Sequence, residues 1–240
     1  MKIIFFVTIL INFLFSITLT PFYVTIDNKK ENNVIFTVSN ATKEPVPVNI
    51  SVLELIANSN QKETRVKTQK IEFYPEQFIL NPKEIKNIRL RYQGSKLPAK
   101  EEVFRVIAKE LNINVSDETN NTKPTTVNAK IITKFTYEAL LFVRQPTAKE
   151  KLEVGLNKTS QGLDVTIKNS GTASVIPQFS AYDFIVTTID NKEYKLLEDD
   201  LKGTKVKRVL AGKTNIFSLN NISSIPLNKI KNIRLERKFK

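Results

Sequence analysis

The longest regular pattern of apolar and polar positions in the chain lies between Lys130 and Pro146, in KIITKFTYEALLFVRQP. Read at a period of two, one face is almost wholly apolar, comprising Ile131, Thr133, Phe135, Tyr137, Ala139, Leu141 and Val143. Such a face, rich in β-branched and aromatic residues, is typical of a β-strand. The other face is polar in its first half and apolar in its second. The pattern predicts one strand of about fourteen residues, more than twice the usual length, with one end in a core and the other offered to a partner.

The rest of the chain alternates in shorter segments that are separated by turn residues. Strands are predicted at 22–26, 33–39, 46–56, 71–75, 78–80, 85–92, 101–111, 152–156, 163–169, 174–179, 184–188, 193–197, 206–210, 214–219 and 230–235. The segment 101–111 can also be read as a helix from its Glu, Ala, Lys and Leu content, but its alternation favours a strand. The polar segments 58–68 and 112–128 are predicted loops. Short strands at intervals of about 8–12 residues predict β-sandwiches.

The length of the chain sets the number of sandwiches. A chain of 240 residues allows one large β domain or two domains of about 100–130 residues. The segment 146–151 reads as a linker, because Pro146 cannot continue a central strand. We therefore expect a first domain over 19–145 and a second over 146–240.

Three residue types that carry much of protein chemistry are absent. The sequence contains no histidine, no cysteine and no tryptophan. Without histidine there is no imidazole base and no Ser-His-Asp triad. Without cysteine there is no thiol nucleophile, no zinc-thiolate site and no disulfide. No carboxylate pair or Ser-Lys dyad has a telling spacing, so we expect no enzyme, no metal and no cofactor.

The chain is strongly basic, with a formal net charge of +13. A nucleic-acid-binding protein would gather this charge into a patch or an arm. Here the lysines and arginines are spread along the chain, often next to glutamates. The distribution favours a solvated basic surface over a nucleic-acid site.

The N-terminus has the order of a secretory signal peptide. Lys2 is followed by the apolar run 3–15 and then by hydroxyl residues at Ser16, Thr18 and Thr20. This order predicts a signal peptide over 1–18, cleaved near Thr18, although no Ala-x-Ala site is present. The alternative is an uncleaved membrane anchor, for which the run has only just the required length.

Four segments carry a resemblance to a known family. They are Phe36–Asn40 with Glu44-Pro45-Val46; Tyr74-Pro75 and Phe78–Pro82 running into Ile88-Arg89-Leu90; Phe104-Arg105-Val106 with Lys109-Glu110 and the later Phe142–Pro146; and Arg208–Gly212. In this order and spacing, the chain resembles the PapD-like periplasmic pilus-assembly chaperones over nearly all of its mature length. One departure is Lys83, which stands where the family pattern has the glycine of a Pro-Gly turn.

The resemblance implies an all-β fold of two immunoglobulin-like β-sandwich domains arranged as an L. It also implies a periplasmic location and a chaperone that holds fimbrial subunits by donating a strand to their open sheet edges. Partners would be the subunits and an outer-membrane usher, with self-association favoured by the exposed strand. In the register implied by the motif ending at Arg144, the donor face is Val127, Ala129, Ile131, Thr133 and Phe135.

The family also implies basic residues that hold the terminal carboxylate of the subunit. The usual places are not basic here: the first strand reads Phe22–Thr25, and the long strand has Leu140 at the matching position. The chain looks more like the divergent, spore-coat-like or archaic branch, in which the arginine of the Phe-Arg-Val segment recurs. Arg105 is then the first candidate and Lys134 the second, since a guanidinium can hold a carboxylate through two hydrogen bonds. Arg144 is expected to join the two domains.

Two other classes of function stay open on the sequence alone. A β-sandwich adhesin or fibre subunit would share the strand pattern, but we expect such a subunit to have one domain with an exchangeable N-terminal extension. An exported carbohydrate-binding module or enzyme is disfavoured by the missing tryptophan, histidine and cysteine. The two domain-sized halves and the long internal strand favour the chaperone.

Overall fold

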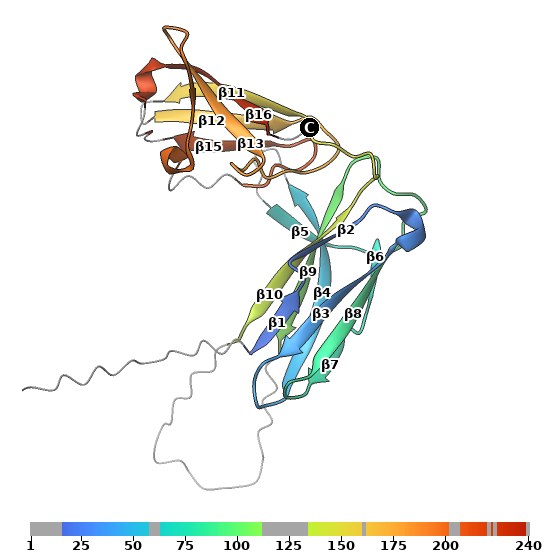
Figure 1. Ribbon diagram of the computed structural model, residues 1–240. Coiled ribbons are helices and arrows are strands. Elements are labelled where there is room, and N and C mark those ends of the chain that lie inside the picture. Colours follow the sequence, from blue (N-terminus) through green and yellow to red (C-terminus); the bar gives the residue numbers. More distant parts are fainter. Residues whose placement is uncertain are drawn as a thin grey trace, which may run out of the picture.

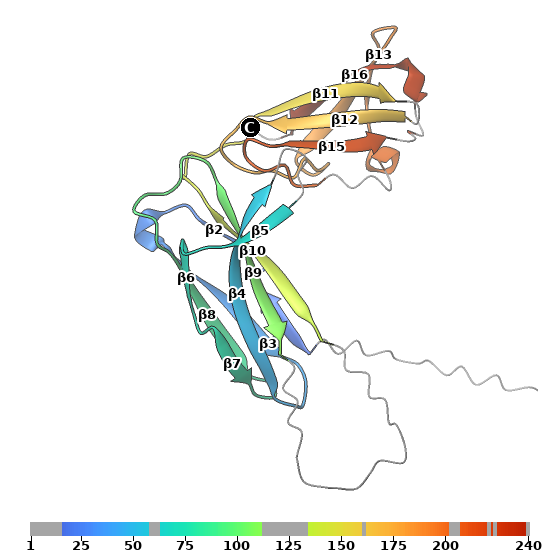
Figure 2. The ribbon, with the colours of Figure 1, turned by 180° about the vertical axis from the view of Figure 1, so that it is seen from behind.

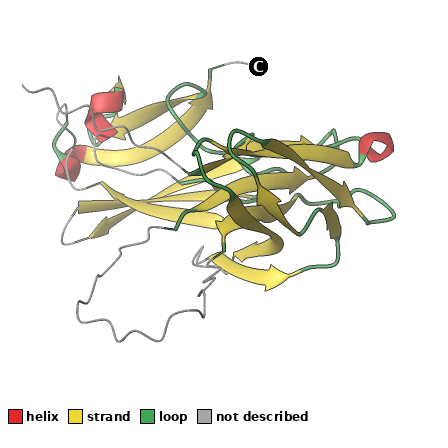
Figure 3. Cartoon of the chain, turned by 90° about the horizontal axis from the view of Figure 1, so that it is seen from below, coloured by secondary structure: helices red, strands yellow, loops and turns green. Residues whose placement is uncertain are grey.

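The computed structural model describes residues 16–57, 63–111, 134–159, 162–201, 207–219, 222 and 225–238. Within these ranges the chain is built from strands, and helix is confined to three short 3-10 turns (Figure 3). The turns are η1 (Lys29–Glu31), η2 (Glu198–Leu201) and η3 (Leu227–Lys229). No helix in the described residues is long and apolar enough to cross a membrane.

The first sandwich contains two sheets (Figure 1). The four-stranded sheet has the order β1 (Ile17–Thr20), β3 (Asn33–Asn40), β8 (Ile85–Tyr92) and β6 (Ile71–Tyr74). The six-stranded sheet has the order β2 (Tyr23–Ile26), β10 (Thr136–Val143), β9 (Glu102–Glu110), β4 (Val46–Ala57) and β5 (Glu63–Lys67), with β7 (Gln77–Leu80) also paired to β4. The described pairs in both sheets are antiparallel except β2 with β10, which are parallel. The chain thus changes sheets between β1 and β2.

The inward-facing side chains of these two sheets form one hydrophobic core. Its largest fully buried members include Phe36, Leu90, Phe104 and Leu141, which come from β3, β8, β9 and β10. Alternation along β8 illustrates the cause: Ile88, Leu90 and Tyr92 are buried, while the residues between them are exposed. Period-two alternation of this kind places one face of each strand in the core.

The second sandwich has its own core between two three-stranded sheets. One sheet has the order β11 (Leu152–Thr159), β12 (Gly162–Asn169) and β15 (Thr214–Leu219), and the other has β14 (Glu193–Lys195), β13 (Tyr182–Thr188) and β16 (Ile230–Arg237). Ile167, Phe184, Leu196 and Leu219 are each buried almost completely between them. Viewed from opposite sides, the two sandwiches lie at an angle to each other, as the arms of an L (Figures 1 and 2). The expected all-β, two-sandwich fold is confirmed.

A buried asparagine closes the end of one strand in each sandwich. Asn40, at the end of β3, donates from Nδ2 to the carbonyl oxygens of Glu44 and Leu80 at 2.8 and 3.0 Å. Asn169, at the end of β12, donates from Nδ2 to the carbonyl oxygen of Ala173 at 2.8 Å and accepts from the Gly171 amide. Each asparagine therefore satisfies main-chain groups of a turn that would otherwise be buried without partners.

Some sequence-based expectations for strands are wrong. The predicted loop 58–68 contains β5, a strand with polar side chains on both faces. The expected strands 174–179 and 206–210 are reduced, in the described residues, to one bridge between Val175 and Val209.

The segment 101–111, for which the alternation favoured a strand over a helix, forms the strand β9. Of the long predicted strand, the structure describes β10 only from Thr136 to Val143.

The first described strand bears on the predicted signal cleavage. Ile17 and Leu19 are buried at 0% and 2% exposure in the first core, and Thr18 pairs with Ser39 of β3. Cleavage near Thr18 would remove Ile17 and half of β1. The signal peptide and its boundary at 18 stay predictions, and a cut upstream of Ile17 would leave β1 whole.

Lys83, where the sequence departs from the Pro-Gly pattern, still adopts the backbone that the turn requires. Its φ is +63°, in the left-handed region that favours glycine. Its side-chain amine donates to the carbonyl oxygen of Ala41. The turn geometry is therefore retained with a residue that costs more backbone strain than glycine.

Replacing Asn40 tests the importance of the buried turn contacts. We expect Asn40→Ala to lower the free energy of unfolding by about 1–3 kcal/mol, because the carbonyl groups of Glu44 and Leu80 lose a buried donor. Urea denaturation measures the change. A loss below about 0.5 kcal/mol would contradict this role for the asparagine, and Asn87→Ala, at an exposed position of β8, is the control.

Candidate functional site

One edge of strand β10 is paired along its whole length, and the other edge is paired with a described strand along only half of its length. Its whole length pairs antiparallel with β9, from Thr136 opposite Lys109 to Val143 opposite Glu102. On the other edge, Leu140–Val143 pairs with β2, where the Leu140 amide donates to the Phe22 carbonyl at 2.9 Å. No described strand pairs with this edge between Thr136 and Ala139. One edge of β10 is therefore closed at its end and open at its beginning.

The alternation of the ladder identifies the main-chain groups on the open edge. The Phe135 carbonyl accepts from the Glu110 amide of β9 at 3.2 Å, so odd-numbered residues direct their main-chain groups toward β9. The amides and carbonyls of Thr136 and Glu138 consequently face away from β9, on the side without a described partner strand. Unpaired main-chain groups in a row form a template for another strand.

The side chains of β10 divide between the core and the outer face of the sheet. Ala139, Leu141 and Val143 are buried in the first core, and Tyr137 packs against it. Phe135 continues this face and is half-buried, with its ring centroid 6.4 Å from that of Tyr137. Of the predicted donor residues, Phe135 is the one that the structure describes; Val127, Ala129, Ile131 and Thr133 lie outside the described residues.

The first predicted carboxylate-binding residue, Arg105, already has an acidic partner. It lies on β9 directly opposite Leu140 of β10. Its Nε and Nη2 donate to the two carboxylate oxygens of Glu63 at 3.0 and 2.8 Å. This hydrogen bonding lowers the pKa of the Glu63 carboxyl below its ordinary value. A new carboxylate would have to displace or share Glu63 to reach Arg105.

Beside this pair, Arg65 of β5 donates to both carboxylate oxygens of Glu138 at 2.6 and 2.9 Å. Arg65 also pairs with Glu63 at 2.7 Å. The four side chains form a line of alternating charge across the outer face of the six-stranded sheet. We call this line, made of Glu63, Arg65, Arg105 and Glu138, the ionic ladder.

Lys134, the second predicted carboxylate-binding residue, lies apart from Arg105. Its Nζ donates to the Leu111 carbonyl at 3.3 Å, at the start of β10. Arg105 is opposite Leu140, six residues further along, which corresponds to about 20 Å of strand. The structure therefore does not bring these two candidates into one site.

Arg144 lies at the junction of the two sandwiches. Its Nη1 contacts Oε2 of Glu101 at 3.1 Å, and the Glu101 side chain has no exposed surface. The other carboxylate oxygen of Glu101 accepts from the Ser174 amide of the second sandwich at 3.0 Å. The Glu101 amide also donates to the Thr172 carbonyl at 2.9 Å. Glu101 thus joins Arg144 to main-chain groups of the second sandwich.

A further arginine, Arg208 of the second sandwich, reaches the same junction. Its guanidinium carbon lies 4.7 Å from the ring centroid of Phe142 of β10, and its Nη1 donates to Ser174 Oγ at 3.3 Å. Burial lowers the pKa of Arg208 from its usual value, and the nearby Glu101 charge opposes this change. Among the described residues, Arg208 has no ion pair with a carboxylate. Sequence reasoning noted Arg208 only within a turn motif, and no periodic signal points to its role.

The surroundings of Arg208 combine one cation with apolar surface. Phe142 and the half-buried Leu140 belong to the outer face of β10. Tyr23, which pairs with Leu140, is 65% exposed. A partly buried guanidinium beside apolar side chains suits an anionic group at the end of an apolar segment.

A match to a protein-family model identifies the family of the chain, which no one of these features identifies alone. The model described as pili and flagellar-assembly chaperone, PapD N-terminal domain, matches residues 16–144, more than half of the chain. The chain belongs to this family. It is therefore a pilus-assembly chaperone rather than an enzyme, and the resemblance drawn from the sequence is confirmed at the level of the family.

Solved structures are similar to this chaperone over both sandwiches. The class 5 fimbriae chaperone CfaA matches 93% of this chain and 99% of its own, with a TM-score of 0.57 and 18% identity. A CsuC-CsuE chaperone–tip adhesion subunit complex from the archaic Csu pili of Acinetobacter baumannii matches 84% of this chain and 89% of that chain, with a TM-score of 0.53 and 17% identity. The Salmonella enterica SafA pilin–SafB chaperone complex matches 93% and 97%, with a TM-score of 0.53 and 13% identity. No curated protein sequence matches the chain.

Removing Arg144 tests the junction. We expect Arg144→Ala to lower the free energy of unfolding by about 3–5 kcal/mol, because the buried Glu101 carboxylate loses its charged partner. The double variant Glu101→Gln/Arg144→Ala should recover part of the loss, since the side chain at position 101 is then neutral. Thermal and urea unfolding measure both changes.

The control for Arg144 is Lys168→Ala, which removes an exposed ion pair with Glu153. This change should cost less than about 1 kcal/mol. Equal effects of the Arg144 and Lys168 substitutions would show that the junction pair contributes no more than a surface pair.

Proposed function

We propose that this chaperone captures a pilus subunit in the periplasm by adding β10 and the chain before it as a strand to an open sheet of the subunit. The observation that carries the proposal is the open edge of β10 at Thr136–Ala139, in a strand whose other edge is fully paired. Two of the similar structures are complexes of a chaperone with a tip adhesion subunit or with a pilin. A subunit strand would pair with the groups that β2 leaves open.

The energies of strand addition are sufficient for stable capture. Each main-chain hydrogen bond contributes about 0.5–1.5 kcal/mol net. Each large apolar side chain that enters the subunit core contributes about 1.5–3 kcal/mol. The proposed donor face is Val127, Ala129, Ile131, Thr133 and Phe135, which continues the face that β10 buries in the first core of the chaperone.

The donor face is tested by a pair of substitutions at adjacent positions. We expect Phe135→Asp to abolish subunit capture, because a charged group would enter the apolar core of the subunit. Thr136→Asp is the matched control, since Thr136 is exposed on the opposite face of the strand. The measurement is co-purification from a bacterial periplasm with the small exported proteins encoded beside the chaperone.

Circular dichroism and thermal unfolding accompany this test, because Phe135 is half-buried against Tyr137. If Phe135→Asp unfolds the free chaperone, Phe135 belongs to the chaperone core and the proposed register is wrong. If both variants capture the subunit as the wild type does, the proposed donor face is wrong. If a well-folded wild type captures none of these exported proteins, the proposed capture by β10 lacks its partner and is contradicted for these proteins.

We further propose that the terminal carboxylate of the subunit binds in the junction beside β10. Arg105 is the candidate that the sequence favoured, and its guanidinium is engaged by Glu63. Arg208 supports the same site better, because its described hydrogen-bond partner is the neutral Ser174 hydroxyl. The two arginines approach β10 from different sandwiches. Lys134 is too far along the strand to share a ligand with them.

The carboxylate site is tested on the captured complex. We expect Arg208→Ala to weaken subunit binding roughly 10–100-fold, since a hydrogen bond to a charged group contributes about 1.5–3 kcal/mol. Arg65→Ala, which removes a cation of the ionic ladder on the same sheet face, should change the affinity less than threefold. Binding is measured by competition between chaperone variants for one subunit.

A subunit extended by two residues at its C-terminus separates the carboxylate from other effects. With this subunit, the difference between wild type and Arg208→Ala should vanish. A difference that persists would mean that Arg208 acts through the junction and not through the carboxylate. A loss with Arg105→Ala alone would return the role to Arg105.

Export and delivery complete the proposal. We infer that a signal peptide directs the chain to the periplasm and is removed upstream of β1, which N-terminal sequencing of the exported protein tests.

We also infer that an outer-membrane usher receives the chaperone–subunit complex, since one similar structure is from chaperone-usher pili. Binding of the purified complex to usher-containing membranes tests this step. Assignment to the archaic branch and self-association through the open edge stay predictions.

A further inference from the structure

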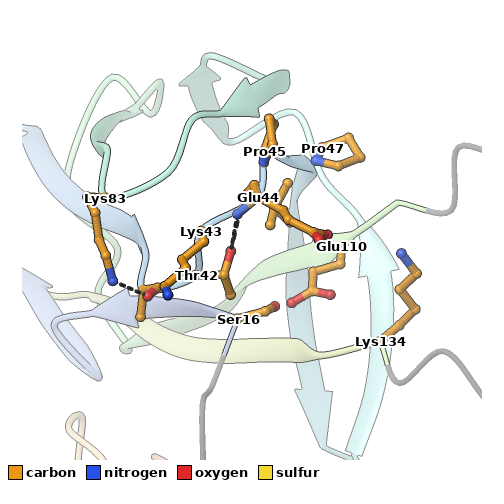
Figure 4. A pocket seen from close by; sticks show the side chains of 11 residues that line it. Ser16, Thr42, Lys43, Glu44, Pro45, Pro47, Lys83, Glu110 and Lys134 are labelled. Atoms are coloured by element: carbon orange, nitrogen blue, oxygen red, sulfur yellow. Dashed lines mark hydrogen bonds between the residues drawn. The ribbon is translucent and has the colours of Figure 1, made fainter.

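A pocket of about 540 Å³ lies at the end of the first sandwich, away from the junction. Ser16 lines it just before β1, Glu110 lines it at the end of β9, and Lys134 lines it before β10 (Figure 4). The turn between β3 and β4 forms the opposite wall. The pocket therefore lies where the first described residues of the chain meet the two strands that carry the proposed function.

Three buried polar atoms around this pocket have no hydrogen-bond partner within the described part of the chain. They include Oε1 of Glu110 and Oγ of Ser16, and the nearby hydroxyl of Tyr137 is a third. Glu110 is only 5% exposed. Burial raises the pKa of the Glu110 carboxyl, while the Phe135 main chain and the Lys134 charge oppose this rise. A buried carboxyl group with an empty acceptor position is costly unless a donor or a cation completes it.

The pairing of β1 fixes the direction of the main-chain nitrogen of its first residue, Ile17. The Ala41 amide donates to the Ser16 carbonyl at 3.1 Å, so residues 16 and 41 form a hydrogen-bonded pair of the ladder. The next pair, Ile17 with Asn40, is then of the other kind. The main-chain nitrogen of Ile17 consequently points away from β3. Because β1 is the edge of its sheet and contacts β10, this side faces β10, whose beginning lies beside Glu110.

The position of Ser16 matches the residue after which a signal peptide would be cut. It is the small residue that follows the apolar run 3–15, and signal cleavage requires a small residue before the cut. A cut after Ser16 keeps Ile17, whose side chain is fully buried in the core. A cut two residues later would remove it.

We propose that cleavage between Ser16 and Ile17 creates an α-ammonium group at Ile17 that forms an ion pair with Glu110 in this pocket. The inference rests on the proposed export signal. Hydrolysis of this peptide bond consumes one water, leaves a carboxylate on the released Ser16, and leaves an amine on Ile17 that is protonated at neutral pH. One event then removes the unpartnered Ser16 hydroxyl and supplies a cation to the unpartnered oxygen of Glu110.

The stability that such a pair contributes depends on pH. An α-amino group has an ordinary pKa of about 7.7–8.0, and pairing with Glu110 raises it. The stability contributed is fully present below the ordinary pKa and is lost as pH rises through the raised value. The pocket also contains Lys43, Lys83, Lys134 and Glu44, and burial raises the pKa of the nearby Tyr137 hydroxyl.

The test uses the full chain exported to a bacterial periplasm. The purified protein is sequenced from its N-terminus, and the Ile17 α-amine is labelled with an amine reagent near pH 6.5, well below its ordinary pKa, and quantified by mass spectrometry. We expect labelling at least tenfold slower in the wild type than in Glu110→Gln, because a rise of one pKa unit lowers the reactive fraction about tenfold. Glu44→Gln, at an exposed position on the rim, should label as the wild type does.

Each outcome decides the proposal. An N-terminus at any residue other than Ile17 overturns it, and so do equal labelling rates in the wild type and Glu110→Gln, which would mean that solvent satisfies Glu110. If Glu110→Gln does not fold, the comparison is between native and urea-unfolded wild type, where a tenfold slower reaction in the native state is again required. Subunit capture does not enter these measurements, so their failure leaves the chaperone function to its own test.

Discussion

The structure depends on one constraint, which is that every main-chain group of a strand needs a hydrogen-bond partner. In β10 this requirement is met along one edge by β9 and along half of the other by β2. The short strand β2 pairs with β10 only from Leu140 to Val143. The chain reaches β2 directly from β1, which belongs to the opposite sheet. The sheet switch therefore leaves the beginning of β10 open while its end is locked into the core. A strand that is both fixed and incomplete can be offered to another protein without loss of its own fold.

The electrostatic features of the molecule follow the same division. Where β10 is closed, charged groups are paired inside the protein: Glu101 with Arg144 at the junction, and Arg105 with Glu63 in the ionic ladder. Arg208 is the exception, because it rests on Phe142 and a serine hydroxyl. An arginine kept from acidic partners in an apolar setting retains its capacity for an incoming anion. The junction thus combines contacts between the two sandwiches with an arginine that, in our proposal, receives the carboxylate of the subunit.

The fold could largely be predicted from the sequence, because period-two alternation marks strands that have one buried face. This holds for β3, β8 and β12, whose alternating positions are buried. The alternation does not predict β5, because this edge strand carries side chains that form ion pairs and has no apolar face. It fails also for β1, whose Ile17 and Leu19 merge with the apolar run before them. The register that turns the Ile17 nitrogen away from β3 depends on pairing, which alternation does not reveal.

For the site, the sequence predicted the strand but not its surroundings. The long apolar face and its stop at Pro146 are local features, whereas the approach of Arg208 to Phe142 joins residues from two domains. The pairing of Arg105 with Glu63 likewise depends on how β5 lies beside β4. Long-range contacts of charged residues leave no periodic trace, so the sequence offered Arg105 and Lys134 as candidates and gave no reason to consider Arg208.

The central claim is that a subunit strand pairs with the open edge of β10, and amide hydrogen exchange measures this directly. In the free chaperone, the amides of Thr136 and Glu138 should exchange rapidly, while those of Ala139 and Leu141, which face β9, should be protected. In the purified chaperone–subunit complex, Thr136 and Glu138 should become as protected as Leu141. A stable complex in which these two amides still exchange rapidly would contradict strand addition at β10 and place the subunit elsewhere on the chaperone.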